Sequence, residues 1–216
     1  MLDALDLAQP LLERGLVSPT WQVRMHPSGE RAVFDLAALQ DDTRHPYRLQ
    51  CEQQVYSELV ETRLHALAAA TVRRGAQVVG LTQHANRVVV DFVGPDGLES
   101  CPAEWVIGAD GAKSSVRAAV GLQLEGSTYP ETSILATTTF PFEQHLAGLS
   151  NVNYCWSPEG TFSLLRLPGQ WRVSLHLEAD RSADAALAPE SLEAELQRIV
   201  PSAQRYEIVE APAYRI

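Results

Sequence analysis

The sequence predicts an α/β (α+β) fold in which one part follows a nucleotide-binding pattern and the other is a mostly antiparallel β-sheet. The first observation is a strand-like run, Trp105–Ile107, that leads through a Gly-Asp-Gly corner into a helix start at Ser114. The second is a series of strand-like runs from 133 to 177, separated by turns that contain Pro and Gly. The length of 216 residues allows one sizeable core or two small ones.

The composition is that of a globular protein, with 45% hydrophobic and 20% charged residues. A net charge of −10 argues against nucleic acid or an anionic membrane as a partner. Cys51, Cys101 and Cys155 are widely spaced and match no metal-binding or redox pattern. No signal peptide and no apolar run of transmembrane length are recognisable. We therefore expect a soluble, cytoplasmic protein with no metal, nucleic-acid or membrane partner.

The first half of the chain predicts two helices and two small sets of strands. Residues 1–14 have helical spacing, interrupted at Pro10 and closed by Gly15, and we expect Met1 to lie inside a helix that begins upstream. Runs at 21–25 and 32–36 form a hairpin around a Pro-Ser-Gly turn. A long amphipathic helix that starts near Gln53 is expected to continue until Gly75. Runs at 78–81 and 87–93 belong to a small antiparallel meander.

The second half predicts more strands and one clear helix. We expect strands at 133–140, 152–156, 161–167 and 171–177, and short strands at 207–210 and 214–216. Pro189 opens a helix that carries acidic residues in its first turns, where they suit the positive end of the helix dipole.

The segment from Gly108 to Arg117 is the candidate nucleotide-binding site of the sequence. Its two glycines allow a ligand close to the backbone, the following helix start favours a phosphate, and Asp110 can accept hydrogen bonds from ribose hydroxyls. The alternative is a tight turn in which Asp110 only caps the helix.

This segment, Gly-Ala-Asp-Gly-x-x-Ser-x-Val-Arg, resembles the "DG" motif of the p-hydroxybenzoate hydroxylase-like (group A) FAD-dependent aromatic hydroxylases. The resemblance implies that Asp110 contacts a ribose and that Gly108 and Gly111 let the cofactor approach the backbone. Ser114 and Arg117 match positions linked to the pyrophosphate and nicotinamide side of the site. The alternative for Arg117 is a helix surface charge paired with a carboxylate.

Residues 46–64 resemble the family's Pro-x-Arg-Leu-Gln-x-Glu-Gln stretch, which implies that Gln53 contacts the flavin; the alternative is a solvated polar residue in a first helical turn. Four strand residues fall in segments similar to the family's central sheet, and we interpret them as packing and sheet-surface residues rather than ligands. They are Tyr154, Arg166, Trp171 and Arg172.

The resemblance implies part of an FAD/NAD(P)-binding Rossmann-like domain at 1–20 and 51–128, and a substrate-domain β-sheet at 21–50 and 129–216. The family's Gly-x-Gly-x-x-Gly and later Gly-Asp motifs do not occur, so we expect a central portion with exposed edges that allow self-association.

The implied function is an FAD-dependent monooxygenase that uses NAD(P)H and O2 to hydroxylate a phenol-like substrate. No protein nucleophile is needed for such chemistry, and the catalytic groups stay unassigned. The alternatives are a non-catalytic truncated module without bound flavin, or a related flavoprotein reductase or halogenase.

Overall fold

The computed structural model describes residues 1–127, 132–177 and 183–214. It divides into two compact units, the first made of Met1–Thr62 and Thr128–Ile216 and the second of Arg63–Ser127. The first unit contains an eight-stranded sheet, and the second contains a three-stranded sheet and a short helix. The mixed α/β class predicted from the sequence is confirmed.

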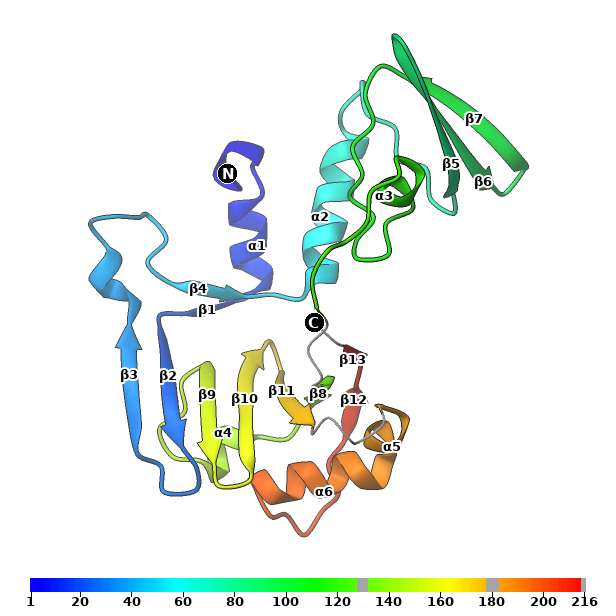
Figure 1. Ribbon diagram of the computed structural model, residues 1–216. Coiled ribbons are helices and arrows are strands. Elements are labelled where there is room, and N and C mark those ends of the chain that lie inside the picture. Colours follow the sequence, from blue (N-terminus) through cyan, green and yellow to red (C-terminus); the bar gives the residue numbers. More distant parts are fainter. Residues whose placement is uncertain (128–131, 178–182, 215–216) are drawn as a thin grey trace. The chain divides into compact units, whose positions relative to one another are not determined.

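The eight-stranded sheet runs in the order β12-β8-β11-β10-β9-β2-β3, with β13 also paired to β8 (Figure 1). All of its pairs are antiparallel except β2 with β9, which are parallel. The strands β2, β3 and β8–β11 confirm the predicted hairpin and the four predicted strands. Their bounds are Thr20–Met25, Arg31–Asp35, Thr132–Thr138, Val152–Ser157, Gly160–Leu167, Gln170–Leu177, Ile208–Glu210 (β12) and Ala213–Tyr214 (β13). Positions 215 and 216 of the last predicted strand lie outside the described residues.

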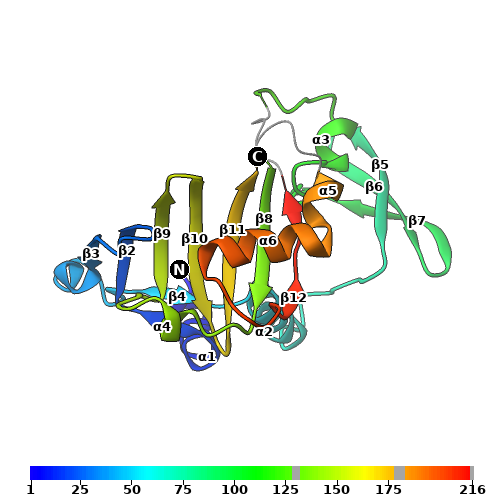
Figure 2. The same ribbon diagram turned by 90° about the horizontal axis from the view of Figure 1, so that it is seen from below.

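One face of this sheet is covered by α6 (Pro189–Ile199), which crosses the strands as Figure 2 shows. Pro189 occupies the first turn of α6, as predicted, and the helix buries Leu192, Leu196 and Ile199. These side chains pack on the inward residues of β8, β10 and β11, such as Leu164 and Val173. Two short helices that the sequence did not predict, α4 (Phe142–His145) and α5 (Ala183–Leu187), join this core.

The N-terminal segment forms a 3₁₀ turn, η1 (Asp3–Leu5), followed by α1 (Ala8–Arg14). The predicted interruption at Pro10 is wrong, because Pro10 lies in the first turn of α1, where its missing N–H breaks no helical hydrogen bond. Gly15 ends the helix as predicted. Beyond it, β1 (Leu16–Ser18) pairs with β4 (Arg48–Gln50) in a separate two-stranded ladder, and η2 (Leu36–Leu39) lies between β3 and β4.

The helix α2 spans Gln53–His65, so it begins at the predicted residue but ends well before Gly75. None of the residues of α2, all of which the structure describes, is fully buried, and Leu67 beyond its end is 47% exposed. Most helices in proteins depend on tertiary packing of their apolar face. The apolar stripe of α2 stays half-exposed, and this explains why the helix does not continue to Gly75. Gly75, with a φ of +67°, instead turns the chain into the next strand.

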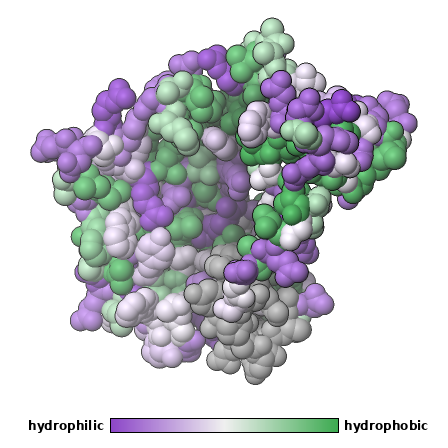
Figure 3. Space-filling view, turned by 45° about the horizontal axis from the view of Figure 1, so that its top comes forward, coloured by the Kyte–Doolittle hydropathy of each residue, from purple (hydrophilic) through white to green (hydrophobic). Residues whose placement is uncertain are grey.

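The second unit holds the predicted meander, β5 (Gln77–His84), β6 (Arg87–Gly94) and β7 (Gly97–Ala103), and the helix α3 (Ser115–Ala119). The predicted strand at Trp105–Ile107 is wrong: these residues lie outside every strand of the described chain. A strand requires a paired neighbour, and Trp105 and Ile107 instead stay 86% and 90% exposed. Figure 3 shows apolar patches, in green, among the hydrophilic side chains of the face in view.

Across the described ranges, the structure contains no helix both long enough and apolar enough to cross a membrane.

His26, at the end of β2, makes the stability depend on pH. Burial lowers the pKa of His26 below its ordinary value of 6.5, and the nearby Arg24 lowers it further. Below about pH 6.5 the unfolded chain therefore binds more protons at this site than the folded chain does. We expect His26 to favour folding above about pH 6.5 and to lose this contribution as the pH falls. Urea unfolding at about pH 8 and about pH 5 should show a smaller difference in His26→Gln than in the wild type. An equal difference in both proteins would contradict this assignment.

Candidate functional site

Asp110 is held at the corner that precedes α3. Its Oδ1 accepts a hydrogen bond from the Ser114 hydroxyl, and its Oδ2 accepts from the backbone N–H groups of Ser115, at 2.7 Å, and Val116, at 3.2 Å. Ser114 is the N-cap residue of α3, and its Oγ accepts from the Arg117 N–H at 3.0 Å. The structure thus gives Asp110 the capping contacts that the turn composition predicted as the alternative.

The same contacts favour the ionised carboxylate. The pKa of Asp110 lies below its ordinary value of 3.8, mainly because the Ser114 hydroxyl and then the Val116 N–H stabilise the charged form. An ionised carboxylate offers about four acceptor positions. Three of these are used within the turn, so Oδ1 keeps one acceptor position for a ligand hydroxyl, on a side chain that is exposed to solvent.

The two glycines of the motif, Gly108 and Gly111, have different structural roles. A Cβ at Gly108 would lie 2.9 Å from Cγ1 of Val116, so this glycine lets the loop pack against α3. Gly111 has a φ of +80°, which side-chain-bearing residues rarely adopt, and a Cβ there would meet nothing within 4 Å. The backbone beside Asp110 is therefore open to an approaching molecule at Gly111.

Arg117 binds its own loop. Its guanidinium donates to the carbonyl oxygens of Gly111, at 3.5 Å, and Ala112. Both predicted alternatives assumed another partner, either a ligand or a carboxylate. The observed contacts tie α3 to the loop 111–112, and a role of Arg117 or Ser114 toward a pyrophosphate stays a prediction.

Gln53 is the first residue of α2 and belongs to the first unit, whereas the motif from Gly108 to Arg117 belongs to the second. The side chain of Gln53 is exposed, and Glu52 directly before it is anchored. Arg172 on β11 donates to both oxygens of Glu52, at 2.9 and 3.1 Å, and to Glu210 on β12, at 2.8 Å. All three contacts are made by one guanidinium nitrogen, Nη2, and this ion pair ties the start of α2, and hence Gln53, to the sheet. No local pattern predicts this ion pair, because Glu52 and Arg172 are 120 positions apart in the chain.

The other strand residues also have structural partners, in agreement with their interpretation as packing and surface residues. Trp171 is 3% exposed, and its Nε1 donates to Glu143 at 2.8 Å. Arg166 pairs with the same carboxylate at 3.2 Å and stacks over the Trp171 ring. Tyr154 packs edge-on against Trp21 and accepts a hydrogen bond from Arg48 at 3.2 Å.

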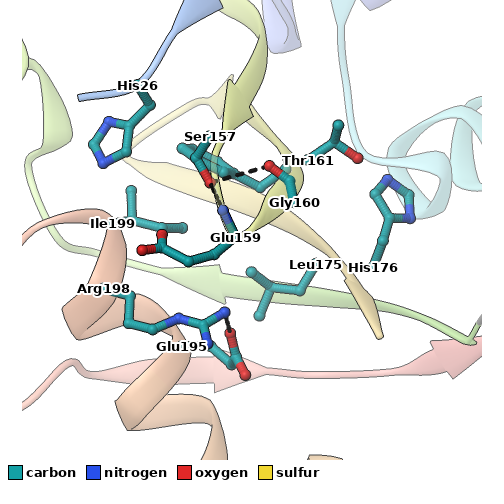
Figure 4. A pocket seen from close by; sticks show the side chains of 11 residues that line it. His26, Ser157, Glu159, Gly160, Thr161, Leu175, His176, Glu195, Arg198 and Ile199 are labelled. Carbon is teal, nitrogen blue, oxygen red and sulfur yellow. Dashed lines mark hydrogen bonds and ion pairs between the residues drawn. The ribbon is translucent and has the colours of Figure 1, made fainter. Parts of the chain in front are cut away.

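Two cavities of the first unit differ greatly in size. The one in Figure 4 lies between the β9–β10 turn and α6, is lined by His26, Glu159 and Arg198, and has a volume of about 40 Å³. That volume suits a water molecule and is too small for an aromatic ring, since cavities that accept benzene measure about 150 Å³. The other, between α1 and β4, measures about 340 Å³ and has room for a substituted ring.

The residues of the motif fit a nucleotide cofactor. Asp110 offers an ionised acceptor for ribose hydroxyls, and Gly111 leaves the adjoining backbone unobstructed. Gly108 keeps the loop close to α3, which holds both features in place. The open backbone at Gly111 and the exposed carboxylate of Asp110 are therefore compatible with a sugar–phosphate group beside this turn.

The sequence matches the family described as FAD binding domain over residues 1–214. It is 28% identical to para-nitrophenol 4-monooxygenase of Pseudomonas sp. (strain WBC-3) over 221 residues, which cover 100% of this chain and 54% of that protein. It is 25% identical to pentachlorophenol 4-monooxygenase of Sphingobium chlorophenolicum, over 78% of this chain and 31% of that protein.

A solved structure agrees with these matches. The crystal structure of p-nitrophenol 4-monooxygenase from Pseudomonas putida DLL-E4 superposes with a TM-score of 0.90 at 29% identity and covers 100% of this chain and 55% of that one. The chain spans about half the length of the curated relatives that it matches along its whole length, at 54% of each.

Proposed function

Because this chain belongs to the FAD binding domain family, we propose that it serves an FAD-dependent monooxygenase that hydroxylates a small phenol-like aromatic substrate with NAD(P)H and O2. The observation that carries the proposal is the family match over residues 1–214, together with the geometry of Asp110 inside that match. The relatives named for nitrophenol and pentachlorophenol support a phenolic substrate.

When bound, FAD supplies the redox chemistry: it takes up reducing equivalents from NAD(P)H and activates O2. The chain supplies binding and orientation. Asp110, kept ionised by the Ser114 hydroxyl, would accept hydrogen bonds from ribose hydroxyls. The open backbone at Gly111 would lie beside the adjoining sugar–phosphate, and Gly108, which packs against Val116, would hold this loop in place. We retain Gln53, Ser114 and Arg117 as further cofactor contacts.

We also propose how the chain divides between an FAD-binding domain and a substrate domain. Residues 1–20 and 51–128 would form part of the FAD-binding domain, and residues 21–50 and 129–216 the substrate-domain sheet. The position of β3 and β8–β11 within the second set supports this division. A cytoplasmic location is supported by Cys51, Cys101 and Cys155, which are all unbridged, as expected in a reducing compartment.

The proposed function is tested by titrating the purified chain with FAD and following the quenching of flavin fluorescence. Saturable quenching that competes with a non-fluorescent ADP-containing nucleotide is the expected result. Quenching that never saturates at millimolar protein would speak against a flavin site on this chain.

We also propose that the chain self-associates through β3, the free edge of the large sheet. Hydrogen bonds from Met25 N to Glu30 O and from Leu36 N to Pro19 O show that the even-numbered residues of β3 face β2. The backbone groups of Arg31, Val33 and Asp35 therefore point outward. Two copies of β3 can pair antiparallel, with Val33 of one copy opposite Val33 of the other. In that register the outward backbone groups of the two strands hydrogen-bond to each other, and Arg31 of each copy lies opposite Asp35 of the other. The strand is thus complementary to itself in both hydrogen bonding and charge.

Val33, which is 52% exposed, is the position to test. Val33→Lys should shift the sedimentation equilibrium of the chain from dimer toward monomer, because two lysines would face each other at the centre of the paired strands. Leu122→Lys, at a 63% exposed loop position, is the matched control and should leave the dimer intact. A monomeric wild type, or a dimer that survives Val33→Lys, would contradict the proposal.

A further inference from the structure

Arg24 on β2 is a buried charge without a carboxylate partner. The residue is 5% exposed, and its Nη1 donates to the carbonyl oxygen of Ala147 at 2.9 Å. Its Nε makes no hydrogen bond, and no carboxylate of the described residues forms an ion pair with it. An arginine in a protein stays protonated, and a buried charge that is not paired is costly. Arg24 therefore lacks the anion that normally accompanies a buried guanidinium.

A second arginine faces Arg24 across the hairpin. The strands β2 and β3 are neighbours (Figure 1), and their register places Arg31 directly opposite Arg24. Arg31 is exposed, and it also forms no ion pair within the part of the chain that the structure describes. Burial lowers the pKa of Arg24, and the charge of Arg31 lowers it further. Like charges opposite each other on paired strands are destabilising. The hairpin thus holds two positive charges that repel each other.

Two glycines shape the space around these guanidinium groups. A Cβ at Gly29, in the turn between β2 and β3, would lie 3.2 Å from Nη2 of Arg24, so the glycine leaves this nitrogen uncovered on that side. A Cβ at Gly148 would lie 2.7 Å from Cζ of Arg31. Gly148 therefore lets the Arg31 guanidinium lie against the backbone beside Ala147, whose carbonyl oxygen accepts from Arg24. Both guanidinium groups meet at residues 147–148.

We propose that Arg24 and Arg31 bind a phosphate group between them, beside the turn that joins β2 and β3. A phosphate carries a charge of about −1.5 to −2 near pH 7 and has three or more acceptor oxygens, so it can neutralise both arginines and accept from each. A carboxylate brings a single negative charge and two oxygens. The phosphate is free or is part of a phosphomonoester, because both present the same oxygens to the site.

A second copy of the chain does not supply this anion to Arg24. The strand pairing proposed above places Asp35 of the second copy opposite Arg31. However, β3 lies between that copy and β2, which carries Arg24. Arg24 therefore gains no carboxylate when two copies pair, and the phosphate site is a separate proposal that does not depend on the bound flavin.

The test is a titration of the full chain, without FAD, with inorganic phosphate at constant ionic strength. We expect the backbone ¹⁵N–¹H NMR signals of Gly29 and Gly148 to shift until they saturate. The melting temperature should rise with phosphate, because a ligand that binds only the folded chain stabilises it. Acetate should bind at least about tenfold more weakly. Phenyl phosphate identifies the source: equal binding indicates a phosphomonoester, and binding of inorganic phosphate alone indicates the free ion.

Arg31→Gln removes an exposed charge and leaves the core intact, so it is the decisive variant. We expect it to weaken phosphate binding by about 10- to 100-fold, the range for lost hydrogen bonds to a charged group. Arg24→Gln should lose saturable binding altogether. Arg87→Gln changes an exposed arginine at the start of β6, in the second unit, and is the matched control. Its affinity should stay within about twofold of the wild type.

Three results would overturn the proposal. Signals that never saturate in the wild type would exclude the site. Equal phosphate affinities in the wild type and in Arg31→Gln would exclude the role of the two arginines. Equal binding of acetate and phosphate would exclude a site for phosphate. Because no readout involves flavin, each of these failures is distinguishable from failure of the FAD titration.

Discussion

Replacing Trp171 with alanine is expected to lower the free energy of unfolding by about 3–5 kcal/mol. The side chain is 3% exposed and packs edge-on against Phe142, with ring centroids 6.1 Å apart. Its removal leaves a cavity in the core beneath α4 and strips Glu143 of the indole N–H donor at 2.8 Å. Both the cavity and the lost hydrogen bond contribute to this loss, while Glu143 keeps its ion pair with Arg166 at 3.2 Å. Urea unfolding monitored by far-UV circular dichroism measures the effect.

Two variants separate these contributions. Trp171→Phe keeps most of the ring volume and removes only the N–H donor, so we expect a loss of about 1–3 kcal/mol. Trp156→Ala alters a tryptophan of β9 that is 55% exposed, and the expected change is within about 0.5 kcal/mol. If Trp171→Ala and Trp156→Ala lowered the free energy of unfolding by the same amount, the assignment of Trp171 as buried and Trp156 as exposed would be contradicted.

Replacing Asp110 with alanine should weaken FAD binding by about 10- to 100-fold, the range expected when hydrogen bonds to a charged group are lost. The substitution removes the acceptor for ribose hydroxyls and the cap on the N–H groups of Ser115 and Val116. Asp110→Asn keeps a capping oxygen but loses the charge, and an intermediate affinity is expected. Flavin fluorescence titration of the three proteins measures the series.

The control for this series is Asp91→Asn. Asp91 on β6 also accepts a hydrogen bond from a serine hydroxyl, that of Ser100, but it lies outside the motif. The affinity for FAD should therefore stay within about twofold of the wild type. If Asp110→Ala binds FAD as tightly as the wild type does, Asp110 is a helix cap and nothing more.

Local signals in the sequence predicted most of the strands and helix starts. The hairpin of β2 and β3 follows from two alternating runs around a Pro-Ser-Gly turn, and the start of α6 follows from Pro189 and its acidic neighbours. Ser114 as the N-cap of α3 follows from its hydroxyl just before an apolar run. Each of these features is decided within a few residues, and this is why one sequence suffices to predict it.

Features that depend on distant partners escaped prediction. Trp105–Ile107 has the residues of a strand, yet pairing decides whether a strand forms, and the described chain pairs nothing with this segment. The ion pair between Glu52 and Arg172 joins residues 120 positions apart. The hydrogen bond between Asp3 and His45 joins residues 42 positions apart, so His45 had no recognisable partner in the sequence. Spacing rules detect only partners that share a helix, a strand or a turn.

The central claim is that the segment from Gly108 to Arg117 holds the sugar–phosphate part of FAD. The most direct measurement is a two-dimensional ¹⁵N–¹H NMR titration of the chain with FAD and, separately, with lumiflavin, which has the ring but no ribityl or ADP portion. The backbone signals of Gly111, Ala112, Ser114 and Ser115 should shift with FAD and stay in place with lumiflavin. Unmoved signals at these residues under saturating FAD, or equal shifts with lumiflavin, would contradict the claim.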